Sequence, residues 1–121
     1  MDNRYAGRFD NEIWYQVFKN GEPFTHKRSY KYVTHSPDGF AWGYFGSGPA
    51  QLSFALLLEE TNNVDLSMAL YQEYKREVIA ALPQAGKWSL TSKNIKDWVC
   101  AHKPKNAFEL TGHEKPDKWS I

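Results

Sequence analysis

Apolar and polar residues alternate with a period of two near the start of the chain, between residues 4 and 24. Within this stretch, residues 13–18 place apolar or aromatic groups on both faces of an extended run, and residues 4–9 form a shorter run of the same kind. Asn20-Gly21 follows, a dipeptide that adopts the positive φ angles of a tight hairpin turn. The pattern predicts two strands joined through Asp10-Asn11, then a hairpin. One sheet face should meet helices, and the other is available to a second copy of the chain or to a loop.

A short aromatic run at residues 40–46 predicts a further strand, which leads through a glycine-rich junction into a long apolar segment. Pro49 is favoured at the first helical position, where its missing N–H costs nothing, and Ser47 or Gly48 would serve as the cap. The helix is predicted to run from Pro49 to Glu60. Residues 52–58 are apolar nearly all round, which is typical of a helix buried on most sides.

Two more helices are predicted after this one. Asp65 is the expected cap of the first, in which apolar residues recur every four positions until Pro83 ends it. Thr91 or Ser92 would cap the second, shorter helix. Cys100 follows a Trp-Val pair and is expected to be a small core residue.

These elements predict an α+β fold: a small antiparallel sheet of three or four strands packed on a buried helix, with two further helices. We assign residues 1–100 to a single domain and residues 101–121 to a partly extended C-terminal tail. A length of 121 residues suits one domain with one core.

Composition limits the classes of function. Aromatic residues make up 16% of the chain, more than a core of this size encloses, which favours exposed rings and a homodimer or higher homo-oligomer. The formal net charge of +1 gives no long-range attraction to nucleic acid, so binding of long nucleic acid is not expected. Without a long apolar segment or a second cysteine, we predict a cytoplasmic protein with no membrane association.

The glycine-rich junction is the first candidate binding site. Free amides at a helix start, together with the positive end of the helix dipole, favour an anion, and glycines allow close approach to Gly46, Ser47 and Gly48. Against this, the junction lacks the Lys-Ser/Thr pair of a Walker loop, and Pro49 removes one donor. The alternative is a strand-to-helix turn in which glycines only permit tight packing.

The polar connection at residues 25–39 is the second candidate. Cations that pair with phosphate alternate there with rings on which a base stacks. If the connection folds over the glycine junction, a nucleotide-sized pocket results; otherwise these are ordinary solvated surface charges. Together the two candidates give the predicted ligand-binding residues: Lys27, Arg28, Lys31, His35, Tyr44, Gly46, Ser47 and Gly48.

Catalytic and metal chemistry find little support in the sequence. The four histidines fall at spacings that match no common metal site, and no second sulfur ligand exists, so no metal site and no cofactor are predicted. His35 beside Ser36 suggests either a general base or a residue that braces the turn. Glu59 and Glu60 are interpreted as solvated polar residues rather than an acid/base pair. No catalytic residue is assigned.

The most distinctive motif is the run HSP, GF, WGY and GSGPAQL between His35 and Leu52, supported by YQ, K, EV, LP and W between Tyr71 and Trp88. These residues make the chain similar to the domain-of-unknown-function family numbered 6166, found in small bacterial, archaeal and phage proteins. The likeness covers residues 4–99. It implies a domain over this range and an accessory role in phages or mobile elements, but no activity. Phe45 departs from the pattern, since a small residue is more usual there.

The function predicted from the sequence is non-catalytic binding of a small anionic, nucleotide-like ligand, with sequestration of a host signalling nucleotide as the phage setting would suggest. Two alternatives stay open. One is a protein–protein interaction module or inhibitor without a small ligand; the other is a hydrolase of a phosphorylated or acylated small molecule, which requires His35 near Ser36 or Ser47.

Overall fold

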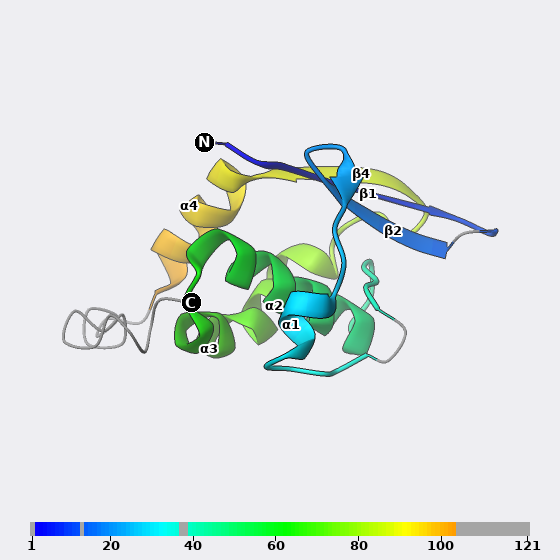
Figure 1. Cartoon of the computed structure of the whole chain (residues 1–121). Coiled ribbons are helices and arrows are strands. Elements are labelled where there is room, and N and C mark those ends of the chain that lie inside the picture. Colours follow the sequence, from blue (N-terminus) through cyan, green and yellow to red (C-terminus); the bar gives the residue numbers. More distant parts are fainter. Residues whose placement is uncertain (1, 13, 37–38, 104–121) are drawn as a thin grey trace.

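The computed structural model describes residues 2–12, 14–36 and 39–103, and it is an α+β fold with one four-stranded antiparallel sheet laid over a layer of helices (Figure 1). The strand order is β3-β2-β1-β4. The elements in chain order are β1 (Arg4–Asp10), β2 (Trp14–Lys19), β3 (Glu22–Pro23), α1 (Lys27–Tyr30), α2 (Ser47–Thr61), α3 (Val64–Tyr74), the π-helical turn η1 (Lys75–Ile79), β4 (Gly86–Thr91) and α4 (Ser92–His102).

The N-terminal strands form as their alternation predicts. β1 and β2 pair from Tyr5 opposite Lys19 to Asp10 opposite Trp14. Asn20 and Gly21 have φ angles of 53° and 85°, so they form the expected turn into the short strand β3. A positive φ angle costs glycine little conformational energy, and it costs asparagine less than most other residues. For this reason the Asn-Gly dipeptide is common at such turns.

The fourth strand is not where the sequence places it. Residues 40–46 form no strand, so that prediction is wrong: Gly43 has a φ of 85°, and its N–H donates to the carbonyl of Ile79 instead of to a neighbouring strand. The strand next to β1 is β4, paired from Thr91 opposite Arg4 to Gly86 opposite Phe9.

Helix α2 is the centre of the fold, as its all-round apolar pattern predicts. Its residues from Gly48 to Leu58 are all buried. It begins two residues earlier than expected: Gly46 is the cap and Pro49 occupies the third position, not the first. Pro is tolerated there because none of the first four N–H groups has an intrahelical partner. Asn62, with a φ of 52°, ends the helix.

The remaining helices begin at polar caps. Asn63, not the predicted Asp65, caps α3 by accepting a hydrogen bond from the Leu66 N–H. Thr91 caps α4 as predicted, in a capping box with Asn94. Cys100 is exposed, so its prediction as a core residue is wrong: it lies on the solvent face of α4. The tail was predicted to begin at residue 101, but α4 continues to His102. The part of the predicted tail beyond Lys103 lies outside the described residues.

Within the described ranges, no helix has both the length and the hydropathy required to cross a bilayer.

Candidate functional site

A cavity of about 540 Å³ opens at the start of α2. Its walls come from three separate parts of the chain: the beginning of β2, the connection before α2, and the first turn of α2 itself. The lining residues are Trp14, Tyr15, Ser36, Phe40, Ala41, Tyr44, Ser47 and Gly48. Three of the predicted site residues, Tyr44, Ser47 and Gly48, are therefore brought together in one hollow.

The first turn of α2 contributes Ser47 and Gly48 to the lining of this hollow. Gly46 is extended and has no side chain with which to cap the helix. Among the described residues, none accepts a hydrogen bond from the Ser47 or Gly48 N–H, and Ser47 is exposed. Helix-start amides without a protein acceptor favour an anion.

Gly48 is also required for packing. A Cβ atom at Gly48 would lie 2.6 Å from the Ala41 Cβ atom. Such a contact is much shorter than van der Waals distance, so the connection lies close to the helix only because residue 48 is glycine. At this junction Gly48 is buried against the connection, and Ser47 is the exposed residue of the helix start.

Aromatic side chains form most of the rest of the lining. Trp14 is 65% exposed and Tyr44 is 40% exposed, although both rings border the cavity. Trp14 also has a φ of 68°, a left-handed conformation that is costly for a bulky residue and that recurs at binding sites. Burial, and secondarily Tyr15, raises the pKa of Tyr44, so its hydroxyl is even less readily ionised than that of a free tyrosine.

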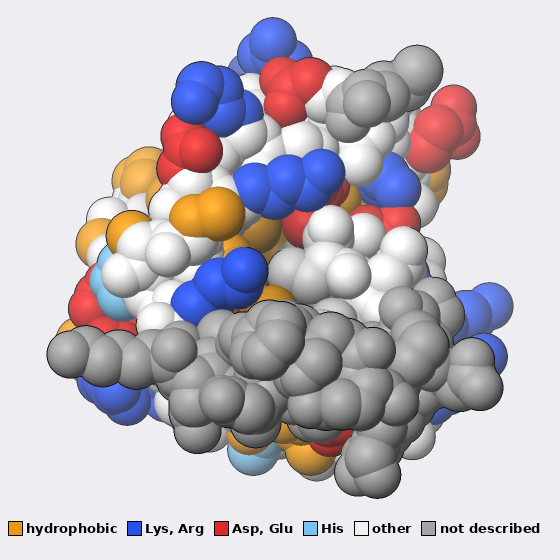
Figure 2. Space-filling model, turned by 90° about the vertical axis from the view of Figure 1, so that its left-hand side faces the viewer, with side chains coloured by type: hydrophobic (Ala, Val, Ile, Leu, Met, Phe, Trp, Pro, Cys, Tyr) orange, Lys and Arg blue, Asp and Glu red, His pale blue; other side chains and the backbone are white. Residues whose placement is uncertain are grey.

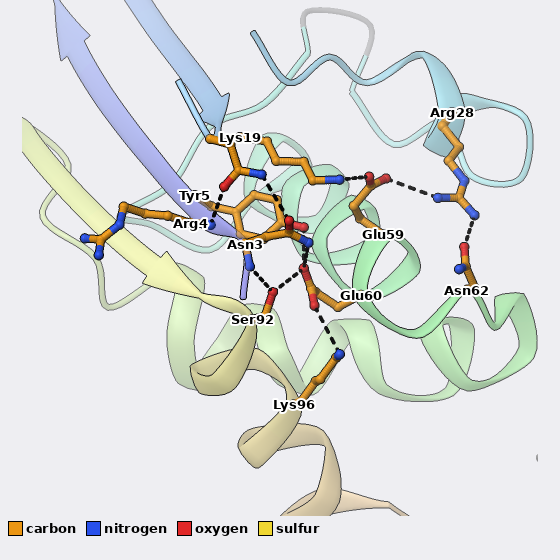
Figure 3. Close-up of polar contacts among 11 residues, drawn as sticks. Asn3, Arg4, Tyr5, Lys19, Arg28, Glu59, Glu60, Asn62, Ser92 and Lys96 are labelled. Atoms are coloured by element: carbon orange, nitrogen blue, oxygen red, sulfur yellow. Dashed lines mark hydrogen bonds and ion pairs between the residues drawn. The ribbon is translucent and has the colours of Figure 1, made fainter. Parts of the chain in front are cut away.

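The basic connection is directed elsewhere. The Arg28 guanidinium forms an ion pair with Glu59 at 3.1 Å and donates to the Asn62 side chain, at the C-terminal end of α2 (Figure 3). α2 has 15 residues, which corresponds to roughly 20 Å between its ends. Lys27 and Lys31 are exposed and do not line the cavity. The structure therefore does not bring the three cations to the glycine junction.

His35 is held by two contacts on the helix side. Its backbone N–H donates to the Gln51 side chain at 2.7 Å, and its Nε2 atom lies 2.5 Å from the Tyr71 hydroxyl. Gln51 in turn donates to the Ser29 hydroxyl and to the Val33 carbonyl, so one buried amide fastens the whole connection to α2. The His35 ring contacts Tyr71 rather than a serine hydroxyl.

Sequence reasoning missed a polar cluster at the other end of α2. Glu60, interpreted above as solvated, has a side chain only 2% exposed. Its Oε2 atom accepts hydrogen bonds from the side chains of Asn3, Tyr5 and Ser92, and Lys96 lies 3.8 Å from Oε1 (Figure 3). The sequence signal available was weak, because the partners lie more than 30 positions away along the chain. The cluster joins β1, α2 and α4 and has a structural role.

Charges are mixed on the surface beside this cluster. Figure 2 shows Lys and Arg side chains interspersed with Asp and Glu on the face that lies at the left of Figure 1. On α4, Lys93 and Asp97 form an exposed ion pair at 2.8 Å, so charges of both signs also neighbour one another along that helix.

Comparison with known proteins identifies a family. No curated protein and no solved structure gives a significant match to the chain. Residues 5–101, most of the chain, match a family of unknown function. The chain therefore belongs to the DUF6166 family, as its motifs between His35 and Trp88 indicate.

Proposed function

We propose that this protein binds, without chemical conversion, a small ligand that combines an aromatic ring system with a phosphate-like anion, most simply a nucleotide, in the cavity at the start of α2. The observation that carries the proposal is the meeting of two kinds of recognition in one hollow. Aromatic rings from Trp14 and Tyr44 border the same space as the Ser47 and Gly48 amides.

The anionic group would lie against the helix start. The Ser47 and Gly48 N–H groups, the Ser47 hydroxyl and the positive end of the α2 dipole all favour negative charge there. No described lining residue is Lys or Arg. We therefore propose a ligand of low charge, such as a monophosphate or a cyclic diester, since a triphosphate would find no cation to neutralise it.

The ring system would stack on the exposed aromatic walls. Stacking on aromatic side chains contributes about 1–3 kcal/mol per base and tolerates different bases. A protein that holds such a compound without turnover removes it from solution, and this would suit sequestration of a signalling nucleotide in a phage setting.

A thermal-shift screen tests the proposal directly. The full chain is heated with nucleoside monophosphates, diphosphates, cyclic nucleotides, the matching nucleosides and inorganic phosphate, and any compound that raises the Tm is recovered and checked for intactness. We expect a monophosphate or cyclic nucleotide to raise the Tm by several degrees and to be recovered unchanged. The Y44A and W14A variants should lose most of this shift.

Phe45 supplies the matched control. It is 71% exposed, neighbours Tyr44 and does not line the cavity, so F45A should respond like the wild type. No stabilisation by any phosphorylated compound, or an equal loss in F45A and Y44A, would reject the proposal. Recovery of a hydrolysed product would favour the hydrolase alternative.

One observation favours a second candidate, a protein-binding surface. Trp14, Tyr44 and Phe45 are all exposed aromatic residues, and such groups are enriched at interfaces. A protein partner covering this surface would contact Phe45 as well as the cavity rim. In the same screen, that function predicts no response to nucleotides in any variant.

A further inference from the structure

A cluster of potential metal ligands lies where the end of α4 meets the junction of α3 and η1. Glu73, Glu77 and His102 each offer one ligand atom, and these three atoms all lie within 4.8 Å of one another. Glu73 belongs to α3, Glu77 to η1 and His102 to the last turn of α4. None of them lines the cavity at the start of α2.

The His102 ring lies between two hydrogen-bond acceptors. Its Nδ1 atom is 2.7 Å from the Trp98 carbonyl oxygen, and its Nε2 atom is 2.8 Å from the Glu77 Oε1 atom. A carbonyl and an ionised carboxylate only accept, whereas a neutral imidazole has a single N–H. If Nδ1–H donates to Trp98, the Nε2 lone pair faces an anionic oxygen. In that tautomer, a metal ion held by both atoms would supply the positive charge that this contact needs.

The surroundings favour ionised ligands. The indole N–H of Trp98 donates to Glu77 Oε1 at 2.9 Å, and this is the main reason why the pKa of Glu77 is lowered; burial opposes it, and Glu73 and His102 act in the same direction as Trp98 but more weakly. Glu77 is therefore a carboxylate at neutral pH. His102 lies near the negative end of the α4 dipole, which also favours a cation.

Two features resemble the construction of known metal sites. Metal-binding histidines commonly donate their other ring N–H to a backbone carbonyl, which fixes the tautomer, and the contact from His102 Nδ1 to Trp98 has this form. Glu77 lies in a π-helical turn, closed by the Ala80 N–H donating to the Lys75 carbonyl at 2.8 Å. Such turns are rare and are frequent at functional sites.

We propose that Glu73, Glu77 and His102 bind a divalent first-row transition-metal ion, with Zn²⁺ as the probe. Mg²⁺ and Ca²⁺ prefer all-oxygen ligand sets, whereas one imidazole with two carboxylates suits zinc and its neighbours. The His102 and Glu77 side chains are 26% and 44% exposed, so an ion has an entry path and its remaining positions are open to water. The inference does not depend on the proposed nucleotide-like ligand.

Zinc binding to the full chain is measured by isothermal titration calorimetry, and the bound ion is counted after equilibrium dialysis. We expect one Zn²⁺ per chain, a rise in Tm with Zn²⁺ and none with the same concentration of Mg²⁺. H102Q and E77Q should each weaken zinc binding at least tenfold. Because ligands must be deprotonated, binding should also weaken as the pH falls.

Two control variants separate this site from adventitious binding. H26Q removes an imidazole elsewhere, and D97N removes an exposed carboxylate of α4; both should bind zinc like the wild type. If H102Q does not fold, E73Q, which leaves the His102–Trp98 stack untouched, provides the same test. The proposal is overturned if the wild type binds less than one ion per chain, or if H102Q, E77Q and E73Q bind as tightly as H26Q.

Discussion

Among single residues, Glu60 joins several distant segments of the described chain through its carboxylate. Three side chains donate hydrogen bonds to its Oε2 atom. Tyr5 belongs to β1, Asn3 directly precedes β1, and Ser92 begins α4. Burial alone would raise the pKa of Glu60, but the hydrogen bonds from Asn3, Tyr5 and Ser92 and the charge of Lys96 outweigh it and lower the pKa. The carboxylate form is therefore the one that stabilises the fold.

The E60Q variant should reveal this contribution and its pH dependence. A group whose pKa is lower in the folded state stabilises the protein above its unfolded pKa, and that stability is lost as the pH falls through the folded pKa. We expect E60Q to unfold about 2–4 kcal/mol more easily at neutral pH, because an amide replaces a buried, hydrogen-bonded carboxylate. Between pH 6 and 3, its stability should decline less than that of the wild type. Urea unfolding at several pH values measures both.

The neighbouring glutamate provides the comparison. The Glu59 side chain is more exposed than that of Glu60, and it forms partly exposed ion pairs with Lys19 and Arg28. The E59Q variant should therefore lower the free energy of unfolding by only about 1 kcal/mol. Equal losses for E59Q and E60Q would contradict a special role for Glu60.

For single residues, the sequence predicted helix caps and turns well but did not predict which distant side chains would come into contact. Thr91, Asn20 and Gly21 were predicted correctly because caps and turns depend on neighbouring residues. The environment of Glu60 depends on Asn3 and Ser92, which lie far away in the chain. The side chains of Glu73, Glu77 and His102 come together only in the fold, because His102 lies far from the two glutamates in the chain.

Among the elements, the connection between β3 and α2 shows how a long segment with little secondary structure is held in place. Gln51 is fully buried on α2, and all of its polar contacts are with this connection. Ser36, which lines the cavity, follows directly after one of the anchored amides. The position of one cavity wall therefore depends in part on a buried amide side chain.

Replacing Gln51 by Leu should loosen the connection selectively. The Val33 carbonyl and the His35 N–H would lose their partner, at a cost of about 3 kcal/mol. Hydrogen exchange should speed up at His35 by at least tenfold, with much smaller changes in β1 and β4. Gln72, a partly exposed glutamine on α3, is the control, and Q72L should leave exchange at His35 unchanged. Uniform acceleration across the sheet in Q51L would contradict this account.

The elements also show which sequence patterns were reliable. The all-round apolar run of α2 and the alternation of β1 and β2 were interpreted correctly, since each pattern is local and strong. β4 was missed, although Trp88 and Leu90 face the core side while Lys87 and Ser89 are exposed. Its six residues run directly into α4, and the helix signal at Thr91 dominated the prediction. The aromatic run at residues 40–46 resembled a strand, but it buries only part of its side chains: Trp42 is fully buried, whereas Tyr44 and Phe45 are exposed.

In the molecule as a whole, the two ends of the described chain are joined. β1 pairs with β4, and the Ser92 N–H donates to the Asn3 carbonyl at 2.8 Å. Gly7 allows β1 to pair with β4 at this point, because a Cβ atom at residue 7 would lie 2.3 Å from the Trp88 indole ring. Trp88 is 7% exposed and packs edge-on against Trp42, so moving its ring away from a new Cβ atom would disturb that contact.

The G7A variant should therefore weaken the entire fold. We expect a loss of about 2–3 kcal/mol, the range typical of overpacking a well-packed core. Because β1 connects the hairpin to β4 and α4, unfolding curves from far-ultraviolet circular dichroism and from tryptophan fluorescence should still coincide. A6S, on the opposite face of the same strand, should stay close to the wild type. Early loss of the fluorescence transition alone would show that the hairpin unfolds separately.

The anchoring of Asn3 beside Ser92 has a practical consequence for measuring ligands. Asn3 contacts Glu60 at one end of α2, whereas Tyr44 and Ser47 border the cavity at the other end (Figures 1 and 3). A tag or biotin fused ahead of Asn3 would emerge on the far side of the molecule from that cavity. Immobilising the protein on a sensor chip through its amino terminus would thus leave the hollow pointing toward the flowing analyte.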